Sequence, residues 1–466
     1  MSSTKNHKNL LMKPMSWKTT KANWIAGALL GLIAVWNPLA GKAQSPTMSE
    51  PDSVGKSIHD LKRNEVIENT HVFGEDGVAR RDSLKGMLNM FYMDQFRHFQ
   101  DPRAPYFMFM SKSGDLAFGV GGQVKVKGYF DWDGALPGWD FAPYDIPIPK
   151  DPADMRNLAA TPSGTGLFFT LLGNHSKVGN FMAYFQADFG GYKERGFRIK
   201  KAYLTVGDWT AGYTTTTFED TKAEPSTVDG AGPNGINSRK NVLIRYMHTW
   251  KKHWTVAGSL EFPSQSIELE EGKTENVNPY LPDLAAFAQY QWDGGNSHLR
   301  LSGLLRTLTY RDLLVGRNYN ITGWALQLST VLNPVAPLDI FGIISTGRGH
   351  ASYTTDLGNG NFDLIPDMDN EGRLYAPMAA GFVLGVQYFW TSKLFSNLAF
   401  SEQTYYPKKD PNDSSYKYGL YAVGNLFWDI TPRFQVGFEY LFGRRKNFDG
   451  DSANASRVMA QMMLSF

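Results

Sequence analysis

Apolar and polar residues alternate through most of the chain after residue 114. At 115–132 the apolar residues share one parity and charged or amide residues occupy the other: Leu116, Phe118, Val120, Val124, Val126 and Phe130 against Asp115, Gln123, Lys125, Lys127 and Asp131. A period of two is that of an extended strand with two unlike faces. The pattern therefore predicts a strand with one apolar side and one charged side.

About sixteen segments of this kind follow one another to the C-terminus, and an even number suits a closed bacterial barrel. They are 115–132, 165–174, 178–189, 196–207, 208–217, 239–250, 253–263, 283–293, 297–310, 319–332, 338–349, 378–390, 393–405, 416–429, 432–446 and 455–466. In the segment 196–207 the parity changes between Lys200 and Lys201, which predicts either a β-bulge or a misplaced strand end.

The connections between these segments alternate in length. Those at 250–253, 391–392 and 431–432 are tight, whereas those at 131–164, 217–238, 263–283 and 351–377 are long and rich in Gly, Pro, Asn and Asp. Short turns at one rim and long loops at the other are typical of outer-membrane barrels. Rings near the strand ends are expected to form interfacial girdles: Trp292, Trp390, Tyr405, Tyr406, Trp428 and Tyr440.

The last strand ends on Phe466, and every second residue from Val458 to Phe466 is apolar. This ending resembles the terminal signal that the barrel-assembly machinery of Gram-negative bacteria reads in outer-membrane barrels. A soluble β-sandwich also alternates, but its strands average ~5–6 residues. The sequence favours an all-β fold, a transmembrane antiparallel β-barrel of about sixteen strands, which is wide enough for an aqueous channel.

The N-terminus has the pattern of an export signal. Five lysines between residues 5 and 21 precede an apolar run from Trp24 to Ala40, and Gly41 and Ala43 are small residues that suit a signal peptidase. Residues 1–43 are therefore expected to be a signal peptide, cleaved before Gln44. An uncleaved helical anchor is the alternative, although the run is short for a span of ~20 residues.

Residues 44–113 lack a strong period. A helix is expected from Asp82 or Ser83, either of which could cap it, to about Phe96. We interpret 44–113 as a periplasmic segment that is an oligomerisation helix, a cover for the end of the pore or a largely disordered leader. The expected domains are the signal peptide 1–43, this segment 44–113 and an outer-membrane barrel over 114–466.

Composition narrows the class of protein. The 466 residues include no cysteine, and 47 basic and 45 acidic residues give a net charge of +2. The lack of cysteine excludes a disulfide framework and a cysteine metal site, and the balanced charge gives no case for nucleic-acid binding. A mean hydropathy of −0.34 is compatible with a barrel, because each strand alternates lipid-facing and water-facing residues.

A block of motifs lies between residues 197 and 246. It comprises Phe197-Arg198-Ile199-Lys200-Lys201-Ala202-Tyr203-Leu204-Thr205-Val206-Gly207, Ala211-Gly212-Tyr213-Thr214-Thr215-Thr216-Thr217-Phe218-Glu219-Asp220, Thr227-Val228-Asp229-Gly230-Ala231-Gly232-Pro233-Asn234-Gly235 and Val242-Leu243-Ile244-Arg245-Tyr246. This succession resembles the DcaP-like outer-membrane porins. The resemblance is sharpest over 115–250. It implies a trimeric barrel with an N-terminal periplasmic helical segment, used for uptake of dicarboxylates and other small anions.

The loop 217–238 is the expected constriction, because the porins that this chain resembles fold a loop inward at this point. It carries Glu219, Asp220, Glu224 and Asp229. The parity expected to face the lumen carries a basic excess: Lys125, Lys127, Arg198, Lys200, Arg245, Arg300, Arg306, Arg433 and Arg457. An acidic loop opposite a basic wall would place a transverse field across the pore, and the basic excess favours anions such as carboxylates. Alternatively, each charge serves only to wet the lumen.

Other functions have less support. Asp367 to Gly372 begins like a calcium loop, but Met378 stands at the twelfth position, where a bidentate Glu is needed. No Gly-x-Ser-x-Gly motif supports a barrel hydrolase. We expect a passive porin without enzymatic activity, cofactor or metal, and a structural, adhesion or plugged barrel is the alternative. The expected partners are small hydrophilic solutes, outer-membrane lipid and lipopolysaccharide, the assembly machinery that reads Phe466, and two further copies in a homotrimer.

Overall fold

The structure is a computed structural model that describes residues 71–73, 105–112, 115–191, 196–409 and 415–466. All of them belong to the larger of two compact units of the chain, Lys56–Phe466. The predicted signal peptide and the helix predicted up to Phe96 lie outside the described residues. Within the described ranges, no helix is long and apolar enough to cross a membrane.

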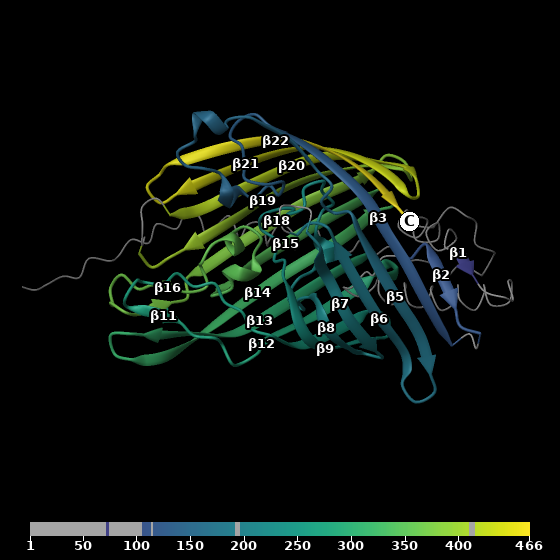
Figure 1. Ribbon diagram of the computed structural model, residues 1–466, viewed down its shortest axis with the longest axis horizontal. Coiled ribbons are helices and arrows are strands. Elements are labelled where there is room, and N and C mark those ends of the chain that lie inside the picture. Colours follow the sequence, from purple (N-terminus) through teal and green to yellow (C-terminus); the bar gives the residue numbers. More distant parts are fainter. Residues whose placement is uncertain (1–70, 74–104, 113–114, 192–195, 410–414) are drawn as a thin grey trace, which may run out of the picture. The chain divides into compact units, whose positions relative to one another are not determined.

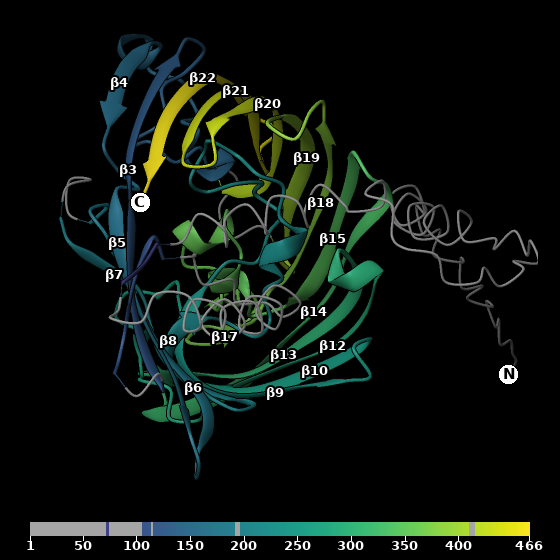
Figure 2. The same ribbon diagram turned by 90° about the vertical axis from the view of Figure 1, so that its right-hand side faces the viewer.

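Sixteen antiparallel strands form a closed barrel in the described part of the chain (Figures 1 and 2). Consecutive strands pair with each other, and the last pairs with the first from Arg457–Asp131 to Ser465–Gln123. In chain order the barrel strands are β3 Leu116–Asp131, β5 Gly166–His175, β6 Gly179–Asp188, β7 Arg198–Val206, β8 Trp209–Thr215, β9 Lys240–Trp250, β10 Trp254–Glu261, β12 Asp283–Trp292, β13 Ser297–Asp312, β14 Arg317–Val335, β15 Leu338–Arg348, β18 Met378–Phe389, β19 Leu394–Tyr406, β20 Tyr416–Thr431, β21 Phe434–Asn447 and β22 Ser452–Ser465.

All sixteen predicted segments are thereby confirmed as strands, with ends that differ by a few residues. The largest difference is at β14, which extends beyond the predicted 319–332 at both ends. Closure leaves no free sheet edge, so every strand finds backbone hydrogen-bond partners on both sides. The predicted bulge in 196–207 is also confirmed. Gln186 of β6 pairs with Lys201 of β7 and Ala187 pairs with Ile199, so Lys200 is an extra residue without a partner position on β6.

The alternation sorts side chains between the outer face and the lumen. Val124 and Val126 are exposed on the outside of β3, while Lys127 between Val126 and Gly128 is only 2% exposed. The same holds along β13, where Leu299 and Leu301 are exposed and Arg300 is buried. Large apolar residues on the outside of a barrel suit a lipid surface.

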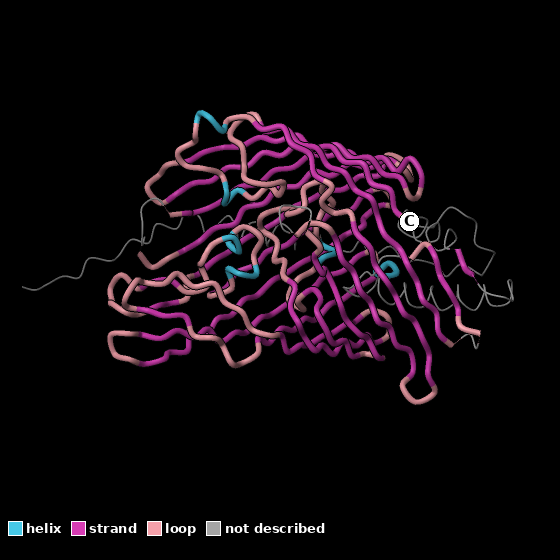
Figure 3. Tube along the Cα trace, viewed as in Figure 1, coloured by secondary structure: helices cyan, strands magenta, loops and turns pink. Residues whose placement is uncertain are grey.

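The two rims of the barrel differ as predicted. The rim that carries the C-terminus has short turns such as 251–253 and 432–433, and the opposite rim carries long connections such as 216–239 and 349–377 (Figure 3). Trp390, Tyr406 and Trp428 are exposed near strand ends, as expected for a girdle, whereas Tyr440 is exposed in the middle of β21. The prediction for Tyr405 is wrong: it is 1% exposed and faces inward, with its ring 4.8 Å from that of Phe362.

Short elements accompany the barrel. The strands are β1 His71–Phe73, β2 Phe107–Met110, β4 Asn157–Thr161, β11 Thr274–Asn276, β16 Ile365–Pro366 and β17 Leu374–Tyr375. The 3-10 turns are η1 Pro143–Asp145, η2 Pro152–Asp154, η4 Thr221–Ala223, η5 Asp293–Gly295, η6 Ala351–Tyr353 and η7 Leu357–Asn359.

Phe466 pairs with Gly122 of β3, and β2 continues along the same edge opposite Ala117–Val120. Part of the predicted segment 44–113 therefore extends the sheet of the barrel.

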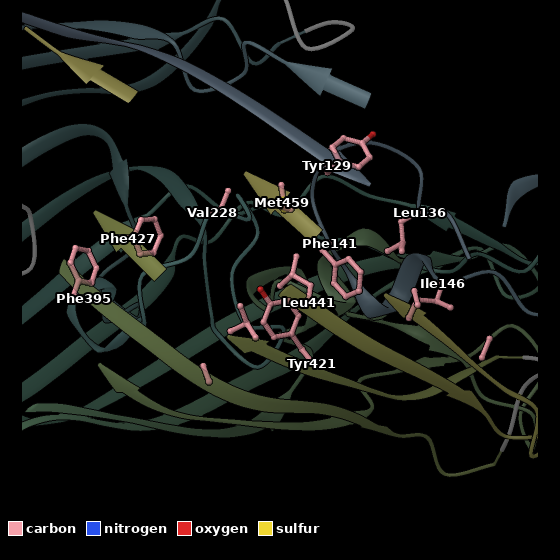
Figure 4. Packing of buried hydrophobic residues seen from close by; sticks show 14 of the residues in the cluster. Tyr129, Leu136, Phe141, Ile146, Val228, Phe395, Tyr421, Phe427, Leu441 and Met459 are labelled. Atoms are coloured by element: carbon pink, nitrogen blue, oxygen red, sulfur yellow. The ribbon is translucent and has the colours of Figure 1, made fainter. Parts of the chain in front are cut away.

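An apolar cluster lies inside the barrel against β19 to β22 (Figure 4). It joins Phe141 and Ile146 of the connection 132–156, named here the first outer loop, to Tyr421 and Leu441 of the wall. The rings of Phe141 and Tyr421 pack edge to face with centroids 6.0 Å apart. Burial of this cluster holds the first outer loop inside the lumen rather than above the rim.

Candidate pore constriction

The connection between β8 and β9, residues 216–239, folds into the lumen and is named here the inner loop. Phe218, Glu219 and Asp220 are at most 4% exposed, although they belong to a loop. Just after β8, the inner loop first contacts the wall at β10, where the Thr217 N–H donates to Glu261 over 2.8 Å. It then follows the inner face of the wall as far as β21. The loop predicted to narrow the pore is thus folded inward, and its role as the constriction stays a prediction.

The first anchor of the inner loop is Asp220. Its carboxylate accepts from His298 over 2.8 Å and from Ser329 over 2.6 Å, and lies 3.5 Å from Arg300. Burial alone would raise the pKa of Asp220, but Arg300 and His298 outweigh it and hold the pKa well below its ordinary value. Asp220 is therefore a charged group that is matched directly by the wall.

Glu219 and Glu224 behave differently. Burial raises the pKa of Glu219 to about 7, against the opposing effect of Lys240. Burial also raises the pKa of Glu224 well above its ordinary value, and the neighbouring carboxylates Glu219 and Asp220 raise it further. Near neutral pH these two loop carboxyls thus carry less negative charge than the sequence suggests.

The second anchor lies at the far end of the inner loop. The N–H groups of Val228 and Asp229 both donate to Glu439 of β21 over 2.7 Å, and Asn425 links the Ser226 carbonyl to the same carboxylate. Asp229 in turn accepts from the Phe141 N–H over 3.0 Å, so it ties the inner loop to the first outer loop. Burial raises the pKa of Asp229 to about 7, with Asp140 and Glu439 adding to the rise.

Several predicted lumen arginines are buried and hold the loops in place. Arg245 donates to Thr217 over 2.8 Å, and Arg300 donates to the Glu219 carbonyl over 3.1 Å. Arg306 pairs with Asp283 over 3.0 Å and with Asp363 over 3.2 Å. Arg457 pairs with Asp131 and donates to the carbonyls of Gly138 and Trp139.

The structure corrects the predicted arrangement for these residues. Each of the four is at most 1% exposed, so none presents its charge to solvent in the lumen. The acidic loop was expected to face a basic wall across open space, whereas Asp220 and Arg300 are in direct contact. Such burial is favourable only when the charges are matched at close range.

Several basic side chains keep partial contact with solvent, and four of them are named here the basic face: Lys125 of β3 and Arg198, Lys200 and Lys201 of β7. Arg198 makes two 3.0 Å hydrogen bonds to Asp188 of β6, yet 42% of its side chain is exposed. Lys200 lies 3.5 Å from the same carboxylate. Asp188 thus neutralises only part of the combined positive charge of Arg198 and Lys200.

The bulge in β7 explains why the basic face is so dense. Lys201 pairs with Gln186, and Arg198 pairs with Asp188, so both share the inner face of β6 and β7. Lys200 is the extra residue between them, and its ammonium group also approaches Asp188. A bulge re-aims a side chain in this way. Lys201 was absent from the predicted lining, although the change of parity at this point was the signal that could have found it.

The remaining predicted residues are placed as follows. Lys127 is buried with its ammonium group 4.1 Å from the centre of the Trp139 ring. Arg433 lies in the short turn between β20 and β21, where its guanidinium stacks on Tyr106, 3.2 Å from the ring centre. Arg433 is thus at the rim with the short turns and is not part of the basic face.

A cavity of about 520 Å³ lies where three inward-folded connections meet. The first outer loop contributes Trp139, Asp140 and Asp145, and the inner loop contributes Gly230, Ala231 and Ser238. The connection 349–377 contributes Ser352, Thr354, Thr355, Gly358 and Asn359. Inward folding of a loop leaves no period in its residues, so the positions of the first and third connections inside the barrel could not be predicted from the sequence.

Comparisons with known proteins agree with this picture. Residues 116–283, which include β3 to β10 and the inner loop, match the family model described as the DcaP outer membrane protein. No curated protein matches the sequence. Over these residues the predicted resemblance is confirmed, and with it the outer-membrane location.

One solved structure shares the fold, and two others show a weaker likeness. The outer membrane channel DcaP of Acinetobacter baumannii superposes with a TM-score of 0.65 at 21% identity, over 77% of this chain and 99% of that one. OmpT of Vibrio cholerae superposes with a TM-score of 0.49 at 9% identity, over 77% of this chain and 100% of OmpT. OmpF of Salmonella typhi superposes with a TM-score of 0.48 at 8% identity, over 77% of this chain and 99% of OmpF. The first of these likenesses confirms the predicted barrel architecture.

Proposed function

We propose that this chain, a DcaP-like outer-membrane porin, lets small hydrophilic solutes diffuse down their gradients and favours anions, carboxylates in particular. The observation that carries the proposal is the contrast between the basic face and the inner loop. The basic face keeps its charge in contact with lumen solvent. The acids of the inner loop are buried, and the pKa of Glu219 and of Asp229 is raised to about 7.

Selectivity follows from this imbalance. Ions that pass a charged lining are sorted by the sign and strength of the charges that solvent leaves unscreened. An arginine presents a planar fork that can hold both oxygens of a carboxylate, and lysines add further positive charge. The rest of the transport step needs no chemistry from the protein, so we propose neither an enzymatic activity nor a cofactor.

The assembly is proposed from the resemblance alone. DcaP-like porins are expected to be trimers, and we propose that three copies of this chain associate in the membrane. The proposed partners also include lipopolysaccharide around the barrel and the assembly machinery that would recognise the strand ending at Phe466. Multi-angle light scattering of the detergent-solubilised protein would measure the number of chains in the assembly directly.

The function is tested by planar-bilayer recording of the refolded protein in a gradient of potassium chloride. We expect stable conductance steps and a reversal potential of the sign that indicates faster passage of chloride than of potassium. A folded barrel that never conducts would support the plugged or structural alternative. Conductance with a preference for potassium would keep the porin and contradict the anion preference.

A further inference from the structure

The first outer loop holds one acidic side chain, Asp140, in the lumen without a partner. Within the described residues its carboxylate forms no hydrogen bond or ion pair; the residue is reached by solvent, although its carboxyl group is surrounded by the loops that fold into the lumen. Both flanking residues are nevertheless fixed. The Trp139 carbonyl accepts from Arg457 over 3.0 Å, and Phe141 is fully buried with its N–H bonded to Asp229. The backbone thus presents a carboxylate that no other contact explains.

The charges around Asp140 fall into two groups. Burial raises its pKa, and Lys127, Lys200, Arg198 and Arg457 act in the opposite direction. Lys127 and Arg457 are buried, and Arg457 is already matched by Asp131. Arg198 and Lys200 belong to the basic face, with 42% and 30% of their side chains exposed. Lumen solvent therefore meets Asp140 and the basic face within electrostatic reach of each other.

The cavity beside Asp140 has a lining of the opposite character to the basic face. Asp140 and Asp145 contribute carboxylates, Ser238, Thr355 and Asn359 contribute hydroxyl and amide groups, and Trp139 contributes a ring. The described lining holds no lysine, arginine or histidine. Carboxylates, hydroxyls and an aromatic face are groups that accept an ammonium ion.

We propose that Asp140 determines specificity in the passage, and that Asp140 and its cavity form with Arg198 and Lys200 a bipolar site for zwitterionic amino acids. The ammonium group of the solute lies toward Asp140, and its carboxylate lies toward the basic face. This inference rests on the proposed porin function and adds a substrate class to it. Dianions gain from the basic face but are repelled by Asp140, so the acid moderates the anion preference.

Two solutes with the same four-carbon chain separate the effects of charge and size. Succinate is a dianion, and 4-aminobutyrate carries one carboxylate and one ammonium group. The experiment measures uptake of each labelled solute into liposomes that contain the wild-type protein, Asp140→Asn, Asp140→Glu or Asp154→Asn. Asp154→Asn is the matched control, because Asp154 is an exposed acid of the same loop that lies outside the cavity lining.

We expect Asp140→Asn to lower the flux ratio of 4-aminobutyrate to succinate about threefold, the effect of one unit charge at ~6 Å in watery surroundings. Asp140→Glu and Asp154→Asn should keep the wild-type ratio. An unchanged ratio in Asp140→Asn, or an equal change in Asp154→Asn, would overturn the inference while wild-type succinate uptake still supports the porin. If the wild-type protein passes neither solute, the proposed function fails together with the inference.

Discussion

The inner loop and the basic face both bring charged residues into the lumen, but they use them differently. Along the inner loop, Asp220 is matched at 2.6–3.5 Å by Ser329, His298 and Arg300, and it is 1% exposed. On the basic face, Arg198 and Lys200 share one aspartate and stay partly exposed. A buried, matched charge fixes the loop in position, whereas an exposed, partly matched charge can act on a passing ion.

The contrast shows what determines the role of a lumen charge. Strand parity decides only that a side chain faces inward. Whether it then meets solvent depends on the loops that cover it, and these cover β13, β14 and β19 to β21 more than β7. Selectivity is therefore expected to depend on the uncovered strands, and stability on the covered ones.

The largest effect is expected where a matched charge of the inner loop loses its partner. Arg300→Ala leaves Asp220 and the Glu219 carbonyl without the guanidinium that they contact. Breaking a buried pair costs ~3–5 kcal/mol, because the remaining charge stays uncompensated. Urea unfolding of the refolded barrel should show this loss, and conductance should become noisier as the loop is released. Arg311→Ala on the same strand, where Arg311 is half-buried and bonds Asn318, should be nearly silent.

A somewhat smaller effect is expected from the apolar anchor of the first outer loop. Phe141 is fully buried against Tyr421, and Phe141→Ala should cost about 3 kcal/mol in unfolding free energy. Because the Phe141 N–H also bonds Asp229, both loops should loosen and single-channel conductance should rise. Phe141→Leu is the control that keeps most of the apolar contact. Equal conductance in the alanine variant and the wild type would contradict the role of this anchor.

The inner loop also predicts a pH dependence of stability. Burial raises the pKa of both Glu219 and Asp229 to about 7, so both bind a proton in the folded state near pH 6 but not in the unfolded state. Their contribution to the unfolding free energy, which comes from the protons bound in the folded state, is complete below the unfolded pKa of ~4 and is lost as the pH rises through the folded pKa of about 7. Near pH 7 the pair should lower the unfolding free energy by about 1.4 kcal/mol per pH unit.

The window for this measurement is pH 6.5 to 8. Burial lowers the pKa of His350 to about 4, so its opposite contribution is confined to pH values below 6.5. Asp220 titrates well below the window, because its pKa is lowered. The double variant Glu219→Gln/Asp229→Asn should have a shallower slope, with a remainder from Glu224, whose pKa is also raised by burial, and Asp154→Asn should retain the wild-type slope. A double variant with the wild-type slope would show that these carboxyls are ionised in the folded protein.

The smallest effect concerns the bulge of β7. Deleting Lys200 removes the extra residue and leaves Arg198 and Lys201 on the inner face in continuous alternation. The barrel should still fold, and the anion preference should fall about threefold through the loss of one charge. Lys200→Gln should lower the preference equally while keeping the bulge. A larger effect of the deletion, seen as a change in conductance, would mean that the bulge itself shapes the passage.

Alternation in the sequence predicted all sixteen strands, because a bilayer and a wet lumen impose opposite polarity on neighbouring residues. It also placed Arg245, Arg300, Arg306 and Arg457 inside correctly. It could not distinguish them from Arg198, because their burial comes from loops that are distant in the chain. Asp140 lies in a connection without periodicity, so only the fold reveals its place beside the basic face.

The most direct measurement compares the reversal potentials of two variants in the same salt gradient. One replaces Arg198, Lys200 and Lys201 with glutamine, and the other is Glu219→Gln/Asp229→Asn in the inner loop. We expect the first variant to lose the preference for chloride and the second to keep the wild-type reversal potential. Loss of the preference in the inner-loop variant, with no change in the glutamine variant, would contradict the assignment of selectivity to the basic face.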